Sequence, residues 1–169
     1  MIDYKLFEFA APHYTGGTWF NGACCAVGLY KDRLFPIGSA QFDEWKKPNP
    51  KVLRVSLVRH PKDVLLVMWN ANKKLQKYSF SEFVFLYSTK HPGYIGNMFS
   101  RYKADIVQRY EDCPWALVEL LDSLGVPKHL VDRVHTIPKQ HLLQLPIKPW
   151  VSRELKQAEK EVFDRYDYY

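Results

Sequence analysis

The sequence has few of the features that mark a secreted, membrane-spanning or disulfide-stabilised protein. It contains 3 cysteines among 169 residues, two of them adjacent, which gives neither an even disulfide framework nor the paired spacing of a zinc site. No run of about 18 apolar residues occurs, and the N-terminus lacks the basic and then apolar order of a secretion signal. We therefore expect buried thiols, no metal site, no contact with a membrane and a cytoplasmic location.

The residues that are present suit one domain with an anionic partner. Hydrophobic residues make up 47% and aromatic residues 15% of the chain, which is enough to bury a core, so we predict a single domain over residues 1–169. The net charge of +6 favours an anionic partner but is spread along the chain. Because the lysines do not cluster with aromatic residues on one element, a nucleic-acid-binding module ranks below a protein that binds a phosphorylated cofactor.

Strand-like and helix-like segments alternate along the chain. Strands are predicted at residues 5–11, near 35–42, at 52–58 and at 104–109. Helices are predicted at residues 19–29, 61–72, 79–89 and 114–124, with Thr18 as the cap of the first helix and Pro61 as the first residue of the second. A last helix is predicted to start after Ser152, its N-cap, and to run to about residue 165. This alternation predicts an α/β fold in which a parallel β-sheet is flanked by helices.

A turn with two glycines separates the first predicted strand from the first predicted helix. Its residues are Thr15, Gly16, Gly17 and Thr18. A strand, a glycine turn and a helix direct several backbone N–H groups and the positive end of the helix dipole at one spot, which favours an anion. The turn has no Gly-Lys-Ser/Thr, so a magnesium-dependent ATPase is disfavoured. An ordinary glycine turn in an α/β protein is the alternative interpretation.

Four segments of the chain resemble the sulfotransferase family. Residues 55–64, Val-Ser-Leu-Val-Arg-His-Pro-Lys-Asp-Val, resemble the segment of cytosolic and related sulfotransferases in which a strand ends in arginine and x-Pro-Lys/Arg-Asp-Val opens a helix. Residues 15–19 are then similar to the family's phosphosulfate loop, Lys/Arg-Ser/Thr-Gly-Thr-Thr followed by Trp or Leu. Residues 106–127 resemble its strand, Tyr-Glu-Asp, helix and Leu-Gly-x-Pro segment, and Trp150 with the helix after it resembles the family's C-terminal end.

The resemblance implies a P-loop-containing, sulfotransferase-like three-layer α/β/α fold. It also implies a nucleotide co-substrate, 3′-phosphoadenosine 5′-phosphosulfate (PAPS), or its product 3′,5′-adenosine bisphosphate (PAP), and no metal. Backbone groups of residues 15–18 and the two threonine hydroxyls would hold the 5′-phosphosulfate. Trp19 would stack on the adenine, Arg59 would grip the 3′-phosphate through its planar guanidinium, and Tyr110 would face the nucleotide.

The chain departs from the family pattern where the catalytic groups are expected. Tyr14 stands where the family has the lysine or arginine that steadies charge on the leaving phosphate, and His13 beside it could carry a proton there. The family's histidine or glutamate base has no counterpart between the first two motifs, where Asp43 and Glu44 are the available carboxylates. Val67 replaces a serine that adds a 3′-phosphate contact. His13, Tyr14, Asp43 and Glu44 are therefore the candidate catalytic residues.

The Arg-Lys-Gly loop that closes over the 3′-phosphate in the family is also missing. The nearest cations before the final helix are Lys139, Lys148 and Arg153. We interpret all three as solvated side chains.

Two functions follow from these patterns. The first is transfer of a sulfuryl group from PAPS to a hydroxyl or amine acceptor, and the alternative is a catalytically degenerate domain that binds a nucleotide or phosphate without turnover. Residues 32–50 and 127–149 are short where longer family members build acceptor walls. This predicts an open site for a large acceptor, or one that a partner completes, and a homo-oligomer is compatible with it.

Overall fold

The computed structural model describes residues 4–29 and 37–169 of the chain, which divides into two compact units. The first unit comprises Met1–Val58 and Arg101–Gln140, and the second comprises Arg59–Ser100 and His141–Tyr169. This division does not test the expectation of a single domain over residues 1–169, which stays a prediction.

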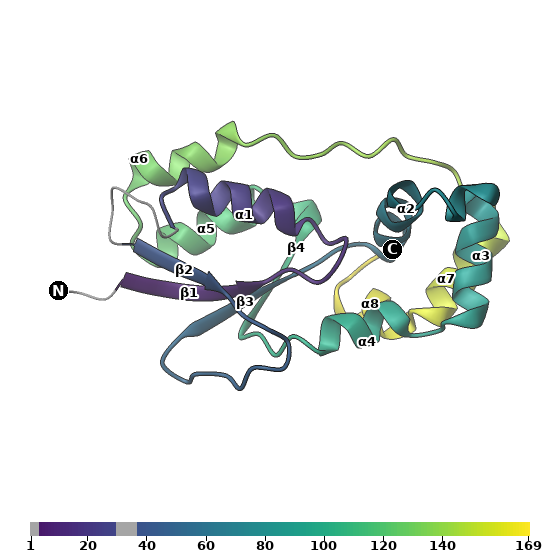
Figure 1. Cartoon of the computed structure of the whole chain (residues 1–169), viewed down its shortest axis with the longest axis horizontal. Coiled ribbons are helices and arrows are strands. Elements are labelled where there is room, and N and C mark those ends of the chain that lie inside the picture. Colours follow the sequence, from purple (N-terminus) through teal and green to yellow (C-terminus); the bar gives the residue numbers. More distant parts are fainter. Residues whose placement is uncertain (1–3, 30–36) are drawn as a thin grey trace. The chain divides into compact units, whose positions relative to one another are not determined.

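The first unit is an α/β structure built on a four-stranded sheet (Figure 1). Its elements are β1 (Tyr4–Ala10), α1 (Gly17–Ala26), β2 (Ile37–Gln41), β3 (Leu53–Val58), β4 (Ile106–Arg109), the 3₁₀ turn η2 (Tyr110–Asp112), α5 (Trp115–Ser123), α6 (Lys128–Val131) and η3 (Asp132–Thr136). The strands are parallel and lie in the order β2-β1-β3-β4. This confirms the predicted α/β class with a parallel sheet. The part of the predicted second strand that precedes Ile37 lies outside the described residues.

One face of this sheet carries the core of the first unit. Phe7 and Phe9 of β1 and Val55 and Leu57 of β3 are buried in one cluster with side chains of α1 and α5, the two helices that cover this face in Figure 1. The ring of Phe9 lies 5.2 Å from the ring of Phe20 in α1. Alternate residues of a strand point to the same face, so this pattern of large apolar residues places the helices on that face.

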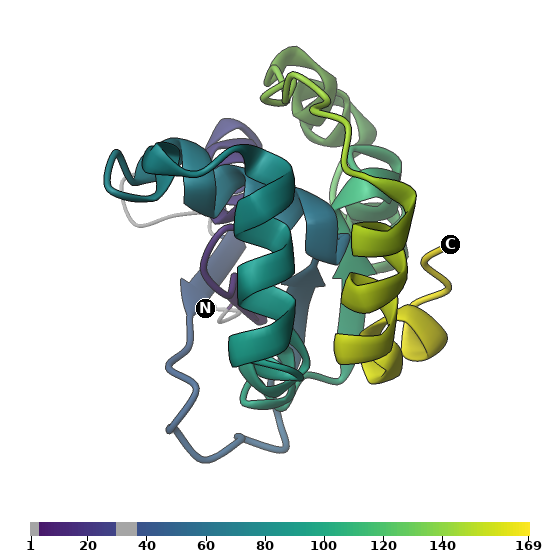
Figure 2. The ribbon, with the colours of Figure 1, turned by 90° about the vertical axis from the view of Figure 1, so that its right-hand side faces the viewer.

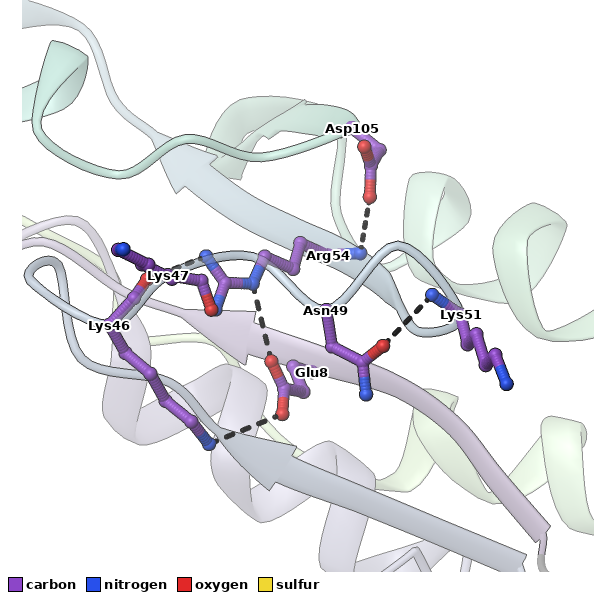
Figure 3. A network of polar contacts seen from close by, with 7 residues as sticks. All are labelled: Glu8, Lys46, Lys47, Asn49, Lys51, Arg54 and Asp105. Atoms are coloured by element: carbon purple, nitrogen blue, oxygen red, sulfur yellow. Dashed lines mark hydrogen bonds and ion pairs between the residues drawn. The ribbon is translucent and has the colours of Figure 1, made fainter.

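A buried ion pair occupies the other face (Figure 3). Arg54 and Glu8 are each 2% exposed, and Nε of Arg54 donates to Oε2 of Glu8 at 3.2 Å. The other two nitrogens of the guanidinium donate to the carbonyl oxygens of Lys46 at 3.1 Å and Lys47 at 3.0 Å. The guanidinium carbon also lies 4.4 Å from the ring centre of Phe42. A buried charge is tolerated only when it is paired and hydrogen-bonded. Arg54 meets this requirement partly through two carbonyl oxygens of the segment after β2, and these hydrogen bonds hold that segment against the sheet.

The second unit is helical. Its elements are α2 (Pro61–Ala71), the 3₁₀ turn η1 (Leu75–Lys77), α3 (Phe80–Lys90), α4 (Tyr94–Ser100), α7 (Pro149–Ala158) and α8 (Lys160–Arg165). Helices α3 and α7 pack side by side, as Figure 2 shows. In the part of the chain that the structure describes, no helix combines the length and the apolar character that crossing a membrane requires.

Two helices of the second unit begin close to where the sequence predicts. Pro61 is the first residue of α2, and Nδ1 of His60 accepts a hydrogen bond from the N–H of Lys62 at 3.1 Å. Ser79 caps α3: its hydroxyl accepts from the N–H of Glu82 at 3.3 Å, and Oε2 of Glu82 accepts from the N–H of Ser79 at 2.8 Å. This reciprocal pair satisfies two backbone donors that the helix itself leaves unbonded.

The prediction that Thr18 caps the first helix is wrong. Helix α1 begins at Gly17, with Gly16 as the N-cap in a left-handed conformation at φ 101°, so Thr18 lies in the first turn. A glycine adopts this left-handed conformation without steric cost. Gly16 can therefore serve as the N-cap, and the helix starts two residues earlier than it would with Thr18 as the cap.

The prediction of one final helix that starts after Ser152 is also wrong. Helix α7 starts at Pro149, and a break at Glu159 separates it from α8. Proline suits the first helical position because it needs no hydrogen-bond acceptor there. Glu159 leaves the helical conformation, and its carboxylate accepts from the N–H of Ile95 at 3.1 Å and of Gly96 at 3.0 Å, at the start of α4.

Candidate functional site

The loop between β1 and α1 ends at an open helix N-terminus. The first hydrogen bond of α1 runs from the N–H of Phe20 to the carbonyl oxygen of Gly16 at 3.1 Å. As far as the described residues show, no side chain caps this helix, because its N-cap is a glycine. The N–H groups of the residues before Phe20 have no partner within the helix, and they carry the positive end of its dipole. This end of the loop therefore offers backbone donors to an anion.

Close packing explains both glycines of the loop. A Cβ on Gly16 would lie 2.3 Å from two ring atoms of Tyr110, and a Cβ on Gly17 would lie 2.5 Å from the Cβ of Ala11. Neither position can accept a larger residue without a shift of its neighbours. The sequence predicts the glycines from backbone freedom alone, and the structure adds that the ring of Tyr110 supports the loop.

The two threonines of the loop have different surroundings. Thr15 is 0% exposed, and its hydroxyl donates to the carbonyl oxygen of Pro12 at 2.6 Å, where its own N–H also donates at 3.2 Å. Thr18 is exposed in the first turn of α1. The hydroxyl of Thr15 thus closes the turn internally, while that of Thr18 is accessible. That both hydroxyls hold a phosphosulfate stays a prediction.

Trp19 and Tyr110 form part of the core of the first unit. They are 6% and 4% exposed, and their rings meet edge to face with centres 6.1 Å apart. Nε1 of Trp19 donates to the carbonyl oxygen of Ile137 at 3.0 Å. A base could stack on Trp19 only if its neighbours moved. The roles predicted for both residues beside the nucleotide stay predictions, and the contacts give each a packing role as well.

His13 and Tyr14 lie on the accessible side of the loop. His13 is exposed, Tyr14 is 37% exposed, and their ring centres are 6.1 Å apart. Tyr14 has a φ of 67°, a left-handed conformation that is uncommon for a residue with a Cβ. Both candidate catalytic side chains are thus accessible beside the glycine loop, and their catalytic roles stay predictions.

Asp43 and Glu44 begin the segment that follows β2. The N–H of Phe42 donates to the carbonyl oxygen of Phe9 at 3.0 Å, so this segment starts beside the end of β1. Oδ1 of Asp43 accepts from a backbone N–H two residues further on at 3.1 Å, and Glu44 pairs with Arg101 at 3.9 Å. The structure therefore brings both carboxylates to the edge of the sheet from which the glycine loop departs, and both have local partners.

Arg59 belongs to the second unit and directly follows β3 in the chain. Its side chain is buried, with 5% exposed. Val67 lies within α2 and is partly buried. The role of Arg59 as the 3′-phosphate ligand stays a prediction.

Lys139 is the residue that the sequence interpretation missed. Its Nζ donates to the carbonyl oxygens of Tyr110 at 2.8 Å, Cys113 at 2.7 Å and Glu111 at 3.4 Å, and it lies 4.5 Å from the ring centre of Tyr110. The interpretation of Lys139 as a solvated side chain is therefore wrong. No local pattern could have revealed it, because its acceptors lie 26 to 29 residues earlier in the chain.

We compared the chain with models of known protein families and with curated proteins. Neither comparison finds a match. The assignment of a function thus rests on the motifs of the sequence and on the geometry of the loop.

The three cysteines differ in exposure. Cys24 and Cys113 are buried, and Cys25 is exposed, which corrects the expectation that all three are buried. Burial raises the pKa of Cys113 to about 12, although the nearby charge of Lys139 lowers it. Within residues 4–29 and 37–169, no group of three or more histidine, cysteine, aspartate or glutamate side chains is placed to hold a metal ion. Anion binding by backbone donors is the chemistry that the loop offers.

Proposed function

We propose that the protein binds PAPS and transfers its sulfuryl group to a hydroxyl or amine acceptor. The observation that carries this proposal is the loop from β1 to α1, which enters the helix through Gly16 at φ 101° with no side-chain cap in the part of the chain that the structure describes. Backbone N–H groups at such a helix start fit the oxygens of a phosphosulfate. We further propose that the α/β fold is the three-layer, P-loop-containing sulfotransferase-like form.

The second motif supports a nucleotide with a 3′-phosphate. Strands β1 and β3 are parallel neighbours, with Ala10 opposite Ser56, so both end at the same edge of the sheet. Ligands of parallel α/β sheets bind beyond the carboxyl ends of the strands, where the direction of strand order changes. The glycine loop follows β1, and Arg59 is the residue that directly follows β3. Arginine binds a phosphate through two parallel hydrogen bonds, which suits the 3′-phosphate.

The reaction needs few groups. The acceptor oxygen or nitrogen attacks sulfur, the bond between sulfur and the 5′-phosphate oxygen breaks, PAP leaves, and the acceptor proton passes to a base. Asp43 and Glu44 are the proposed bases because they directly follow Phe42, whose N–H donates to the carbonyl oxygen of Phe9 near the end of β1. The N–H groups at the start of α1 stabilise the charge that develops on the leaving phosphate. His13 and Tyr14 are the proposed groups beside that phosphate.

Binding without turnover is the second candidate function. It is favoured by Tyr14, which takes the place of the family's lysine, and by the pairing of Glu44 with Arg101. A protein that had lost its main electrostatic catalyst and its base would keep the loop donors and Arg59, and it would still bind PAP.

Calorimetric titration tests the nucleotide site. PAP, AMP and ATP are titrated into the wild type, into Arg59→Ala and into a control variant, Arg153→Ala, whose side chain is exposed. We expect PAP to bind at least about tenfold more tightly than AMP, an advantage for a bidentate charged contact that Arg59→Ala removes and Arg153→Ala keeps. Equal affinities for PAP and AMP, or no binding of PAP, would contradict the proposal.

A turnover assay then separates the two candidates. The protein is mixed with PAPS, and the release of PAP is followed with and without acceptors of different size, from simple phenols to polysaccharides. Release that an acceptor accelerates, with sulfate found on that acceptor, supports the transferase. Tight binding of PAP with no acceptor-dependent release supports the domain that binds without turnover.

A further inference from the structure

Lys139 fastens the turn between β4 and α5. Its Nζ donates to the carbonyl oxygens of Tyr110, Glu111 and Cys113 at 2.8, 3.4 and 2.7 Å. An ammonium group has three N–H donors, and these three acceptors match them. The lysine is also only partly exposed, so its charge is less screened by water than that of a surface lysine. These hydrogen bonds add to the one from the N–H of Cys113 to the carbonyl oxygen of Tyr110 at 3.2 Å, and together they fix the turn.

The turn that Lys139 holds is the one that supports the glycine loop. The ring of Tyr110 lies so close to Gly16 that a Cβ there would be 2.3 Å from it. The ammonium of Lys139 lies 4.5 Å from the centre of the same ring. The loop backbone and the cation therefore both lie against one aromatic ring, and attraction between the cation and the ring adds to the hydrogen bonds that fix the tyrosine.

A second contact ties the same segment to the start of α1. The carbonyl oxygen of Ile137 accepts from Nε1 of Trp19 at 3.0 Å, and Trp19 lies in the first turn of that helix. We call residues 137–139 the clasp, because Ile137 binds α1 and Lys139 binds the turn after β4. Two residues of this segment, Ile137 and Lys139, thus contact the helix that follows the glycine loop and the turn whose Tyr110 ring lies against it.

We propose that Lys139 is the positioning residue of the anion-binding loop: its hydrogen bonds to the turn after β4 keep Tyr110 against Gly16, and it places a positive charge on the ring that packs against the loop. This inference rests on the proposed function, since it assigns Lys139 a role in binding the 5′-phosphate end of the nucleotide. Lys139 acts through the ring and through its electric field, while its N–H groups stay with the carbonyls. A partly buried charge strengthens anion binding over several ångströms, where an exposed one is screened.

Three variants test the inference. Lys139→Met removes the charge and the donors while keeping most of the side-chain length, and Lys139→Arg keeps both. Lys128→Met removes an exposed lysine of α6 in the same unit and serves as the matched control for net charge. Affinity for PAP is measured by calorimetry, and the backbone amide signals of Gly16 and Gly17 are recorded by NMR without ligand.

We expect Lys139→Met to weaken PAP binding by at least about tenfold, as the loss of one poorly screened charge interaction would. We also expect it to shift the amide signals of Gly16 and Gly17. Lys139→Arg should restore most of both properties, and Lys128→Met should match the wild type. If Lys139→Met binds PAP like the wild type, or if Lys128→Met weakens binding equally, the inference is wrong.

Failure of the inference about Lys139 can be distinguished from failure of the proposed function. Failure of the wild type to bind PAP would overturn the function, while the amide signals would still report whether Lys139 positions the loop. If Lys139→Met does not fold, the inference is tested on the wild type, by the NMR signal of its Lys139 ammonium. The side-chain ammonium of Lys139 should give an NMR signal protected from exchange with water, and this signal should shift when PAP is added. An ammonium signal that exchanges like those of exposed lysines and ignores PAP would contradict the inference.

Discussion

Replacement of Gly16 by alanine perturbs the loop at its tightest point. The residue has a φ of +101°, where residues with a Cβ are strained, and the new Cβ would meet ring atoms of Tyr110 at 2.3 Å. The strained backbone costs about 1–3 kcal/mol, and forced overpacking costs about another 1–3 kcal/mol. We therefore expect Gly16→Ala to lower the free energy of unfolding by about 2–6 kcal/mol.

Two other glycines of the same unit serve as controls. Gly125 has a φ of +75° but no atom within 4 Å of a built Cβ, so Gly125→Ala isolates the conformational cost, about 1–2 kcal/mol. Gly22 lies inside α1, and a Cβ there would meet its nearest neighbour, a methyl group of Ile137, at an ordinary 3.7 Å. Because alanine favours the helix over glycine, Gly22→Ala should stabilise the protein by up to about 1 kcal/mol.

The three variants are compared by urea unfolding followed by circular dichroism, with linear extrapolation to water. The predicted order of stability is Gly22→Ala, wild type, Gly125→Ala and then Gly16→Ala. A loss in Gly16→Ala no larger than that in Gly125→Ala would refute the contact between the loop and Tyr110, and with it the account of how the loop is supported.

Two further predictions concern buried carboxylates. Arg54→Met removes the buried partner of Glu8 and leaves the exposed ammonium of Lys46, 3.7 Å from the carboxylate, so it should lower the free energy of unfolding by about 3–5 kcal/mol. The double variant Glu8→Leu/Arg54→Leu should lose less; an equal or larger loss in the double variant, by urea unfolding, would count against the ion pair. Burial raises the pKa of Glu159, although hydrogen bonds from Ile95 and Gly96 oppose this, so the folded state binds more protons than the unfolded state above the ordinary pKa of 4.5. The free energy of unfolding should therefore fall as the pH rises from that value, and Glu159→Gln should remove this fall; an unchanged slope in the variant would show that another group causes it.

The sequence predicts the fold well where local chemistry decides it. Alternation of apolar residues over 52–58 and the position of Pro61 predict β3 and the start of α2, because both depend on neighbouring residues only. Thr18 fails as a cap because Gly16 offers an earlier start that local rules permit equally well. The break at Glu159 depends on backbone donors at residues 95 and 96, more than 60 residues away, so no local pattern could show it.

The candidate site is predictable only where it depends on residues that are neighbours in the chain. The glycine turn of residues 15–18 is recognisable because a strand, a turn and a helix follow one another in the chain. The burial of Trp19 cannot be recognised from the sequence, since an indole can pack in a core or stack on a base equally well. The contacts of Lys139 depend on a turn formed 26 residues or more before it, and they become visible only once the sheet brings the two segments together.

We predict that the start of α1 holds the phosphate end of the nucleotide. NMR titration of the wild type with PAP shows whether it does. We expect the amide signals of Gly16, Gly17 and Thr18 to move together and to saturate at the concentration at which calorimetry shows binding. If PAP binds while these three signals stay in place, the loop is not the phosphate site and the account is wrong.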